Sequence, residues 1–224
     1  MPTCEQRRRD MVERQIAGRG ITDPHVLAAM GEVPREAFVP AELAGSAYDD
    51  SPLPIGAGQT ISQPYVVALM IEAAGVGPGD MVLEIGAGSG YAAAILSRIA
   101  GRVLGIERHR ALADGASERL ARLGYDNVTI RCGDGSQGWP EGAPFDAILV
   151  AAGSPAIPQP LCAQLALGGR LVVPVGPAEV QRLTRVTRRG EDRLEIQDLG
   201  GVRFVPLIGA HGWTGGPAAD RPTV

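Results

Sequence analysis

The chain has 224 residues, a length typical of a single globular domain. Hydrophobic residues make up 45% of it and charged residues 21%, which is the ordinary composition of a soluble protein. The net charge of −4 and the aromatic content of 4% provide neither the basic surface nor the stacking platform that nucleic acids need. We therefore expect no nucleic-acid partner.

Residues that bind metals or form disulfides are few and scattered. The three cysteines and three histidines show no CxxC or HExxH spacing, so we expect no bound metal and no disulfide framework. No apolar run reaches the roughly 18 residues of a membrane helix, and the arginines at 7–9 are not followed by the apolar stretch of a signal peptide. These features predict a cytoplasmic protein without a membrane partner, and we expect a monomer.

The first quarter of the chain predicts short helices and loops. Residues 5–17 have a modest apolar helical face. Asp23 followed by Pro24 is typical of a helix start, which predicts a second helix reaching Met30. Residues 33–60 are rich in proline and glycine without a sustained period, so we expect loops there.

Strand-like and helical segments alternate regularly from Gly79 onwards. Strands are predicted at residues 81–85, 102–106, 128–132, 146–152 and 170–175. Helices are predicted at residues 91–100, 110–123 and 158–167, and a further helix is predicted at 65–74, before the alternation begins. Strands separated by helices predict an α/β fold with a doubly wound, mostly parallel sheet. Residues 182–188 and 193–198 are typical of an antiparallel hairpin at its edge, and 203–207 of a last strand.

The strongest chemical signal is the segment Glu84-Ile85-Gly86-Ala87-Gly88-Ser89-Gly90, between a predicted strand and a predicted helix. Glycines at such a turn let a ligand approach the bare backbone closely. The dinucleotide fingerprint G-x-G-x-x-G would place its third glycine one position later, where Tyr91 stands. The carboxylate of Glu84 is a poor neighbour for a pyrophosphate and suits a ligand that carries positive charge.

Two further acidic residues follow the next two predicted strands. Glu107 could accept hydrogen bonds from the two hydroxyls of a ribose, and Asp134 from an exocyclic amine. Each has a simpler explanation by itself, Glu107 as a charge favoured at a helix N-terminus and Asp134 as an ordinary turn residue. Together with Glu84 they converge on the carboxyl ends of the strands. An amine, a ribose and an adenine amine describe S-adenosylmethionine.

The segment from Val82 to Tyr91 resembles motif I of class I S-adenosylmethionine-dependent methyltransferases. More specifically, the chain resembles the protein-L-isoaspartate (D-aspartate) O-methyltransferases over roughly residues 10–208. The stretches that carry the resemblance are VPREAFV at 33–39, LPIG at 53–56, QTISQP at 59–64, GDG at 133–135, APFDAI at 143–148 and RFVPL at 203–207. Motif I is common to the superfamily, whereas TISQP is specific to this family.

The resemblance implies an enzyme that methylates the free carboxylate of L-isoaspartyl, and by its name D-aspartyl, residues in damaged proteins and peptides. The methyl ester then collapses to a succinimide, which starts repair. The implied methyl donor is S-adenosylmethionine and the product S-adenosylhomocysteine, without a metal. The implied cofactor residues are Glu84, Gly86, Ala87, Gly88, Ser89, Gly90, Glu107, Arg108, Asp134 and Gly135. The implied substrate residues are Thr60, Ile61, Ser62, Gln63, Val205 and Pro206, with Ser62 in the catalytic role.

The resemblance also implies the domain organisation. It implies an α/β/α sandwich around a Rossmann-like sheet of seven strands, with extra N-terminal helices. We expect one methyltransferase domain over residues 1–208, in which 1–78 shape the substrate site and 79–208 form the cofactor-binding core. Residues 209–224 are rich in glycine and proline and are expected to form a flexible tail.

The chemistry of Ser62 is consistent with this function. A carboxylate has an unperturbed pKa near ~4, so it is ionised at neutral pH and needs no general base to accept a methyl group. The enzyme would then contribute positioning and desolvation, and the Ser62 hydroxyl could orient the carboxylate. Ser62 before Pro64 is equally typical of a helix N-cap. Val205 and Pro206 could belong to an edge strand that pairs with an extended peptide.

Three alternatives remain open at this stage. The chain could methylate aspartate side chains in a ribosomal peptide natural product, although such relatives commonly carry longer C-terminal extensions. A nicotinamide-dependent oxidoreductase is disfavoured by Glu84 and by the early third glycine, Gly90. A binding module without catalysis is disfavoured by the presence of Ser62 and Asp134.

Overall fold

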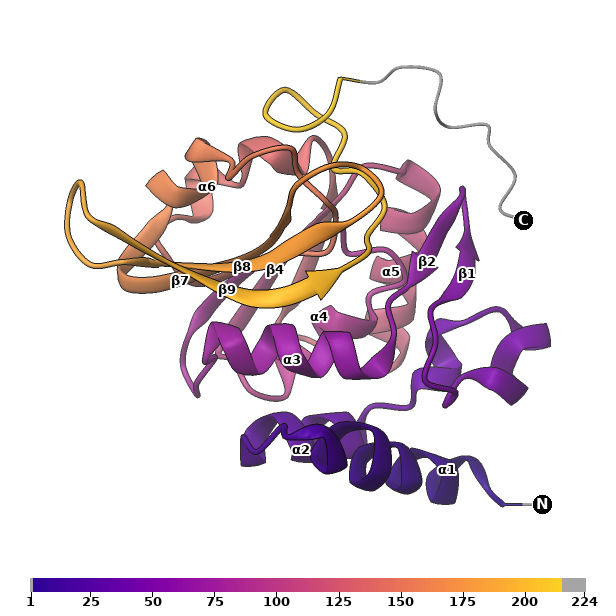
Figure 1. The fold of residues 1–224 in the computed structure, drawn as a ribbon. Helices are drawn as coiled ribbons and strands as arrows, with labels where there is room; N and C mark the ends of the chain where they lie inside the picture. Colours follow the sequence, from indigo (N-terminus) through magenta and orange to yellow (C-terminus); the bar gives the residue numbers. More distant parts are fainter. Residues whose placement is uncertain (1, 215–224) are drawn as a thin grey trace.

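The computed structural model describes residues 2–214, so the part of the predicted tail from 215 to 224 lies outside the described residues. Within the described part, no helix is long and apolar enough to cross a bilayer. One large sheet dominates the fold, with helices on both of its faces and a separate helical layer formed by the N-terminal residues (Figure 1).

The large sheet has seven strands in the order β5-β4-β3-β6-β7-β8-β9. The strands are β3 (Met81–Ile85), β4 (Arg102–Glu107), β5 (Val128–Cys132), β6 (Phe145–Val150), β7 (Leu165–Val175), β8 (Gln181–Arg188) and β9 (Leu194–Val202). β5, β4, β3, β6 and β7 run parallel, while β8 and β9 are antiparallel additions at one edge. The predicted doubly wound, mostly parallel sheet of seven strands with an antiparallel edge is confirmed.

Alternating side chains of the central strands bury into two different hydrophobic layers. Val82 packs in the layer that contains Ile71 of α3 (Pro64–Ala74) and Ile95 of α4 (Tyr91–Ser97). Its neighbour Leu83 points to the opposite layer, with Leu161 of α6 (Gln159–Ala163). Burial on both faces explains why these strands are mostly apolar. The helix that follows β4 is α5 (Arg110–Arg122), which packs on β4 and β5.

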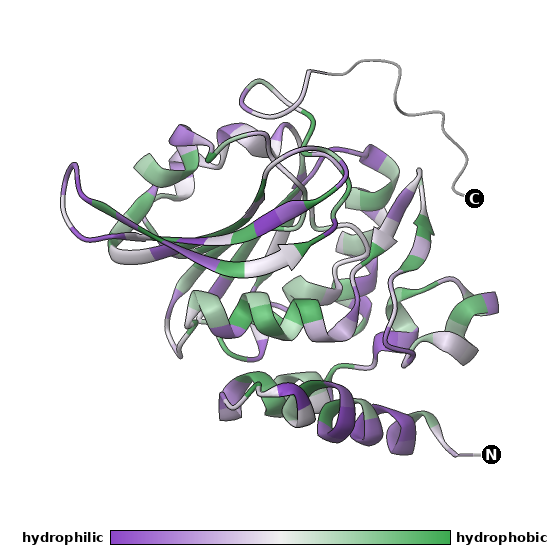
Figure 2. Ribbon diagram, in the orientation of Figure 1, coloured by the Kyte–Doolittle hydropathy of each residue, from purple (hydrophilic) through white to green (hydrophobic). Residues whose placement is uncertain are grey.

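The N-terminal residues form a layer outside α3. The first helix, α1 (Cys4–Asp10), continues into a π-helical segment at Met11–Ile16, and α2 (Pro24–Glu32) starts at the N-cap Asp23 as predicted. Because α2 packs on α3 and α3 packs on the sheet, α3 lies between the two layers. Figure 2 shows this difference in hydropathy: α3 is largely apolar, whereas α1 carries mostly hydrophilic residues and buries none.

Two features of the N-terminal region differ from the predicted loops over residues 33–60. Short 3-10 turns occupy Arg35–Phe38 and Ala41–Ser46. After them, β1 (Leu53–Gly56) and β2 (Gln59–Ile61) form an antiparallel hairpin. Its tight turn places Ala57 at a φ of 52°, between two glycines that also have positive φ. The hairpin escaped sequence reasoning because its strands are too short to show an alternating pattern.

The end of the chain also differs from the prediction. The predicted helix at 158–167 is shorter, because β7 begins at Leu165. The predicted strand at 203–207 is wrong: this segment has no partner strand within the described residues and forms only a bridge between Pro206 and Gly153. The Phe204 amide donates a hydrogen bond to the Gln181 side-chain oxygen at 2.9 Å. This amide is therefore not available to pair with a neighbouring strand.

Candidate active site

A cavity of about 490 Å³ lies at the carboxyl ends of β3 and β4. Its walls are the glycine-rich loop after β3, the hairpin β1–β2 with the following Ser62, and the segment 205–208. Of the predicted site residues, the cavity wall contains Thr60, Ile61, Ser62, Glu84, Gly86, Ala87, Gly88, Ser89, Glu107, Arg108, Gly135, Val205 and Pro206. Three predicted residues are not in the wall: Gln63, Gly90 and Asp134.

The glycines of the loop after β3 have separate structural roles. Gly86, Gly88 and Gly90 all have positive φ, a conformation that strains other residues. Gly90 is the N-cap of α4, and a Cβ there would lie 3.1 Å from a methyl group of Leu120 on α5. The third glycine therefore allows α4 and α5 to pack closely, while Gly86 and Gly88 expose backbone to the cavity.

Glu107 holds the glycine-rich loop in place from the end of β4. The side chain is buried, and its Oε2 accepts a hydrogen bond from the Gly88 amide at 2.9 Å. Its Oε1 accepts one from the His109 amide at 2.8 Å. Each carboxylate oxygen has a second lone pair, so the group can still accept hydrogen bonds from a pair of hydroxyls in the cavity. This arrangement agrees with the ribose-binding role that the sequence suggests.

Glu84 is a buried carboxyl group that lacks a full set of partners. It lies in the cavity wall with only 2% of its surface exposed, and its Oε2 has no hydrogen-bond partner among the described residues. Burial, together with the nearby charge of Glu107, raises the pKa of Glu84 to about 8. A buried acceptor without a donor is costly. A cationic amine in the cavity would supply that donor and its charge.

Ser62 lies in the cavity wall and does not cap α3. The N-cap residue is Gln63, without a side-chain cap, so the capping interpretation of Ser62 is wrong. In the first turn of α3 the amides of Val66 and Val67 donate to the Gln63 carbonyl. The Ser62 hydroxyl is half-buried and forms no hydrogen bond within residues 2–214. It is therefore a donor that a bound anion could use.

Asp134 does not line the cavity, and its carboxylate is bonded to other residues. Its Oδ1 accepts hydrogen bonds from the Ser136 amide and hydroxyl, and its Oδ2 from the Gln137 side chain and the Ala210 amide. Although burial acts to raise it, these hydrogen bonds hold the pKa of Asp134 below its usual value. Its neighbour Gly135 does line the cavity. The start of the predicted flexible tail is thus fastened to this turn, and the Trp213 indole also donates to the Gly153 carbonyl at 3.1 Å.

The segment at Val205 and Pro206 lines the cavity and is bonded to Gly153. The Val205 carbonyl accepts from the Gly153 amide at 2.7 Å, and the Leu207 amide donates to the Gly153 carbonyl at 2.8 Å. Proline has no amide donor. These bonds occupy the side of the segment that faces Gly153, so pairing of its other side with an extended peptide stays a prediction.

Several wall residues escaped sequence reasoning. They are mostly apolar or contribute backbone, although Gln59, Tyr91 and Leu207 lie within stretches that carry the family resemblance. These residues are Ala57, Gly58, Gln59, Val67, Tyr91, Ala92, His109, Ala151, Ala152, Leu207 and Ile208. The position of Tyr91 and Ala92 directly after the glycine loop could have identified those two. Among residues 2–214, no three histidine, cysteine or acidic side chains are grouped so that they could hold a metal ion.

The sequence is similar to a known family over nearly the whole chain. The family model described as "Protein-L-isoaspartate(D-aspartate) O-methyltransferase (PCMT)" matches residues 6–212. The chain belongs to this family. Protein-L-isoaspartate O-methyltransferase 1 of Rhodopseudomonas palustris strain HaA2 is 61% identical over 219 residues, which are 96% of this chain and 89% of the relative. Protein-L-isoaspartate O-methyltransferase 2 of Pelobacter propionicus is 59% identical over 93% of each chain.

Solved structures of the same family share the fold. One protein-L-isoaspartate O-methyltransferase superposes with a TM-score of 0.80 at 32% identity, covering 91% of this chain and 67% of that one. A Plasmodium falciparum member of the family, solved in complex with S-adenosyl-L-homocysteine, gives a TM-score of 0.77 at 28% identity. That alignment covers 89% of this chain and 97% of the other. The family resemblance of the motifs thus extends to the complete α/β architecture.

Proposed function

We propose that this protein transfers the methyl group of S-adenosylmethionine to the free carboxylate of L-isoaspartyl residues in damaged proteins and peptides. D-aspartyl residues, which the family description includes, are a second substrate. The observation that carries the proposal is one cavity with two buried carboxyl groups, Glu84 and Glu107, in one wall and the unbonded hydroxyl of Ser62 in another. Membership of the isoaspartate methyltransferase family supports it.

The cofactor residues follow from the chemistry of the wall. Glu84 would accept from the amine of the cofactor, Glu107 from the ribose hydroxyls, and the backbone at Gly86 and Gly88 would lie against the amino-acid part. Gly135 and Arg108 would border the adenine. For Asp134 to accept from the adenine amine, its bond from Ala210 would have to give way. When bound, S-adenosylmethionine supplies an electrophilic methyl group on a sulfonium.

The substrate carboxylate is already ionised at neutral pH, so the reaction needs no general base. Ser62 would donate a hydrogen bond that orients the carboxylate, with Thr60 and Ile61 beside it. An oxygen of that carboxylate forms a bond to the methyl carbon while the carbon–sulfur bond breaks, and the electron pair remains on sulfur. No proton moves in this step. The protein contributes positioning and exclusion of water.

The decisive experiment is a methyl-transfer assay on two peptides of the same sequence, one with L-isoaspartate and one with normal aspartate. We expect methyl ester formation on the isoaspartyl peptide and none above background on the aspartyl peptide. Equal rates on both would reject the repair function. Transfer to an unmodified aspartate of a ribosomal precursor peptide would favour the tailoring alternative instead.

The pH dependence of cofactor binding provides a separate test of Glu84. Below its raised pKa of about 8, Glu84 is mostly protonated in the free protein. Binding the ammonium group of S-adenosylhomocysteine favours the carboxylate, so a proton is released and affinity rises about tenfold per pH unit below pH 8. Above pH 8 the affinity should level off, and it should fall only where the ammonium group of the ligand loses its own proton. Calorimetry in buffers of different ionisation enthalpy would measure both the affinity and the proton release.

The matched control is Glu84→Gln, for which the affinity should be lower and independent of pH. Equal wild-type affinity at pH 6 and pH 7.5 would contradict the assignment.

The raised pKa of Glu84 also affects the stability of the folded protein. Because the folded pKa lies above the ordinary 4.5, this group stabilises the free protein fully below pH 4.5 and loses that contribution as the pH rises through 8.

We also propose that the protein acts as a cytoplasmic monomer without nucleic-acid or membrane partners. The net charge of −4 supports this, since a negative protein is a poor ligand for phosphate backbones and anionic lipids. Sedimentation velocity at micromolar concentration would measure the mass against the 23.3 kDa of one chain.

A further inference from the structure

Arg35 is a charged side chain in the interior of the protein. It begins the 3-10 turn Arg35–Phe38, within the segment VPREAFV that the family shares, and its exposed fraction is 0%. No carboxylate within residues 2–214 pairs with it. A buried charge without a counter-ion is costly, and an apolar side chain of similar size would often be more stable in its place. Its presence therefore suggests a role other than stability.

The guanidinium of Arg35 connects three separate parts of the active site region. Its Nε donates to the Ala47 carbonyl at 2.7 Å, and its Nη2 donates to the Ser62 carbonyl at 2.8 Å. Its central carbon lies 4.8 Å from the centre of the Tyr91 ring. Tyr91 is the first residue of α4 and lines the cavity. A guanidinium is planar and rigid, so these partners are held in one fixed relation.

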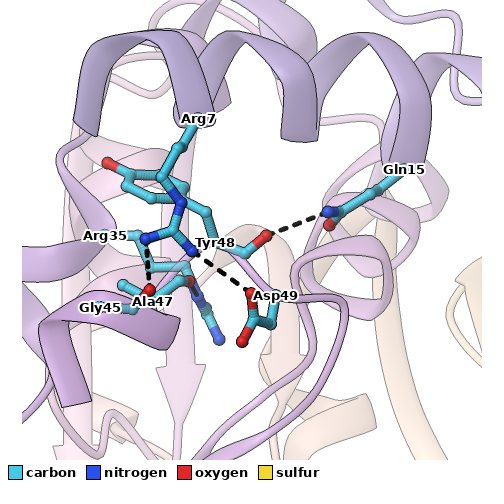
Figure 3. Close-up of polar contacts among 7 residues, drawn as sticks. All are labelled: Arg7, Gln15, Arg35, Gly45, Ala47, Tyr48 and Asp49. Atoms are coloured by element: carbon cyan, nitrogen blue, oxygen red, sulfur yellow. Dashed lines mark hydrogen bonds and ion pairs between the residues drawn. The ribbon is translucent and has the colours of Figure 1, made fainter. Parts of the chain in front are cut away.

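The loop that accepts the Arg35 Nε is itself held from the outside (Figure 3). Arg7 of α1 donates to the Gly45 carbonyl and pairs with Asp49. Gln15 of the π-helical segment donates to the Tyr48 carbonyl at 3.0 Å. The N-terminal helices therefore fix the loop 45–49 on one side and Arg35 fixes it on the other. Through Arg35, this support reaches the backbone of Ser62.

We propose that Arg35 is the positioning residue for Ser62. By fixing the carbonyl of Ser62, it sets the peptide plane between Ser62 and Gln63 and keeps the hydroxyl in the cavity wall. Ser62 receives no such restraint from a helix cap, because Gln63 occupies that place. The inference rests on the proposed role of Ser62 in binding the substrate carboxylate. It also gives the N-terminal helices a role in the active site: they contribute no residue to the cavity wall but support Ser62 through Arg35.

The test is Arg35→Lys, which keeps the charge but cannot bond two carbonyls through a rigid fork. We expect kcat/KM for an isoaspartyl peptide to fall by about 30-fold or more, since misplacement by about 1 Å can cost a hundredfold. The Kd for S-adenosylhomocysteine should change by less than about threefold. Glu107, the proposed acceptor of the ribose hydroxyls, is bonded to the Gly88 and His109 amides and not to Arg35. Hydrogen exchange should become faster at the amides of residues 62–67.

The matched control is Arg188→Lys. Arg188 is half-buried on β8 and also donates to main-chain carbonyls, those of Ala163 and Leu165, but it lies outside the cavity. This variant should keep the wild-type kcat/KM. If Arg35→Lys does not fold, the double variant Arg7→Ala and Gln15→Ala loosens the same loop from its exposed side. It should raise the peptide KM while the cofactor Kd is unchanged.

Two results would overturn the proposal. One is wild-type kcat/KM and wild-type exchange at residues 62–67 in folded Arg35→Lys. The other is a loss of cofactor affinity equal to the loss in kcat/KM, which would make Arg35 a support of the whole domain. If the wild-type protein methylates no isoaspartyl peptide, the proposed function fails, and the exchange measurement still decides whether Arg35 restrains Ser62.

Discussion

Replacing Glu107 with alanine is expected to weaken S-adenosylhomocysteine binding by a hundredfold or more. The change removes the acceptor that we propose for two ribose hydroxyls, and each hydrogen bond to a charged group contributes about 1.5–3 kcal/mol. Two such bonds correspond to roughly a hundredfold or more in affinity. It also releases the Gly88 and His109 amides, which Glu107 holds at 2.9 and 2.8 Å. Isothermal calorimetry of the purified variant would measure the loss.

Two further variants give this experiment its controls. Glu107→Gln keeps the shape and one acceptor oxygen but removes the charge, so it should fall between wild type and alanine. Glu118→Ala removes an exposed glutamate from the adjacent helix α5 and should bind as wild type does. Undiminished binding by folded Glu107→Ala would show that the ribose lies elsewhere.

Replacing Ser62 with alanine is expected to lower kcat/KM for an isoaspartyl peptide by about 10- to 100-fold, the value of one hydrogen bond to a charged group. Stability should not change, because the Ser62 hydroxyl has no hydrogen bond within residues 2–214 and caps no helix. The cofactor affinity should also remain. This combination separates a substrate contact from a structural one and is measured by steady-state kinetics together with thermal unfolding.

The conservative variant Ser62→Thr retains a hydroxyl and should recover part of the lost rate. Full turnover by Ser62→Ala would show that Ser62 has no role in the reaction. A loss of thermal stability large enough to account for the loss of rate would lead to the same conclusion. Arg35 would then be left as a purely structural residue, since its positioning role depends on Ser62.

The central sheet could be predicted because its strands carry their own signal. β3, β4 and β6 are short runs rich in apolar residues. β3 is followed directly by Gly86, and β4 ends at Glu107. The hairpin β1–β2 could not be predicted, since Leu53–Gly56 contains a proline and a glycine and Gln59–Ile61 is only three residues long. Such strands have little intrinsic β propensity, and they form because the neighbouring parts of the fold position them.

Residues 203–207 illustrate the opposite error. Their composition is typical of a strand, but the side chain of Gln181 takes the Phe204 amide and Pro206 has no donor. Only the contacts with Gly153 remain, which form a bridge and not a ladder. The outcome depends on a residue more than twenty positions earlier in the chain, which no local pattern records.

The acidic residues of the site could be predicted only in part. Glu84 and Glu107 end up in the cavity wall because they lie at the carboxyl ends of adjacent parallel strands, a position that topology determines. The direction of the Asp134 side chain depends on the Ala210 amide, 76 positions away, and on the local bonds of Ser136 and Gln137. Arg35 was visible only as part of a family motif, because its partners Ala47 and Ser62 are brought together by the fold.

The hairpin of β8 and β9 offers a place to attach the enzyme to a surface. The exposed turn of this hairpin, at residues 189–193, connects β8 to β9 (Figure 1). Thr187 beside it pairs with Arg170, so the turn lies toward the amino ends of the parallel strands, whereas the cavity lies at their carboxyl ends. No residue of either strand lines the cavity. A linker inserted in this turn would hold the protein on a resin with its active site facing the solution, so that bound enzyme could label isoaspartyl damage in a protein sample flowing past it.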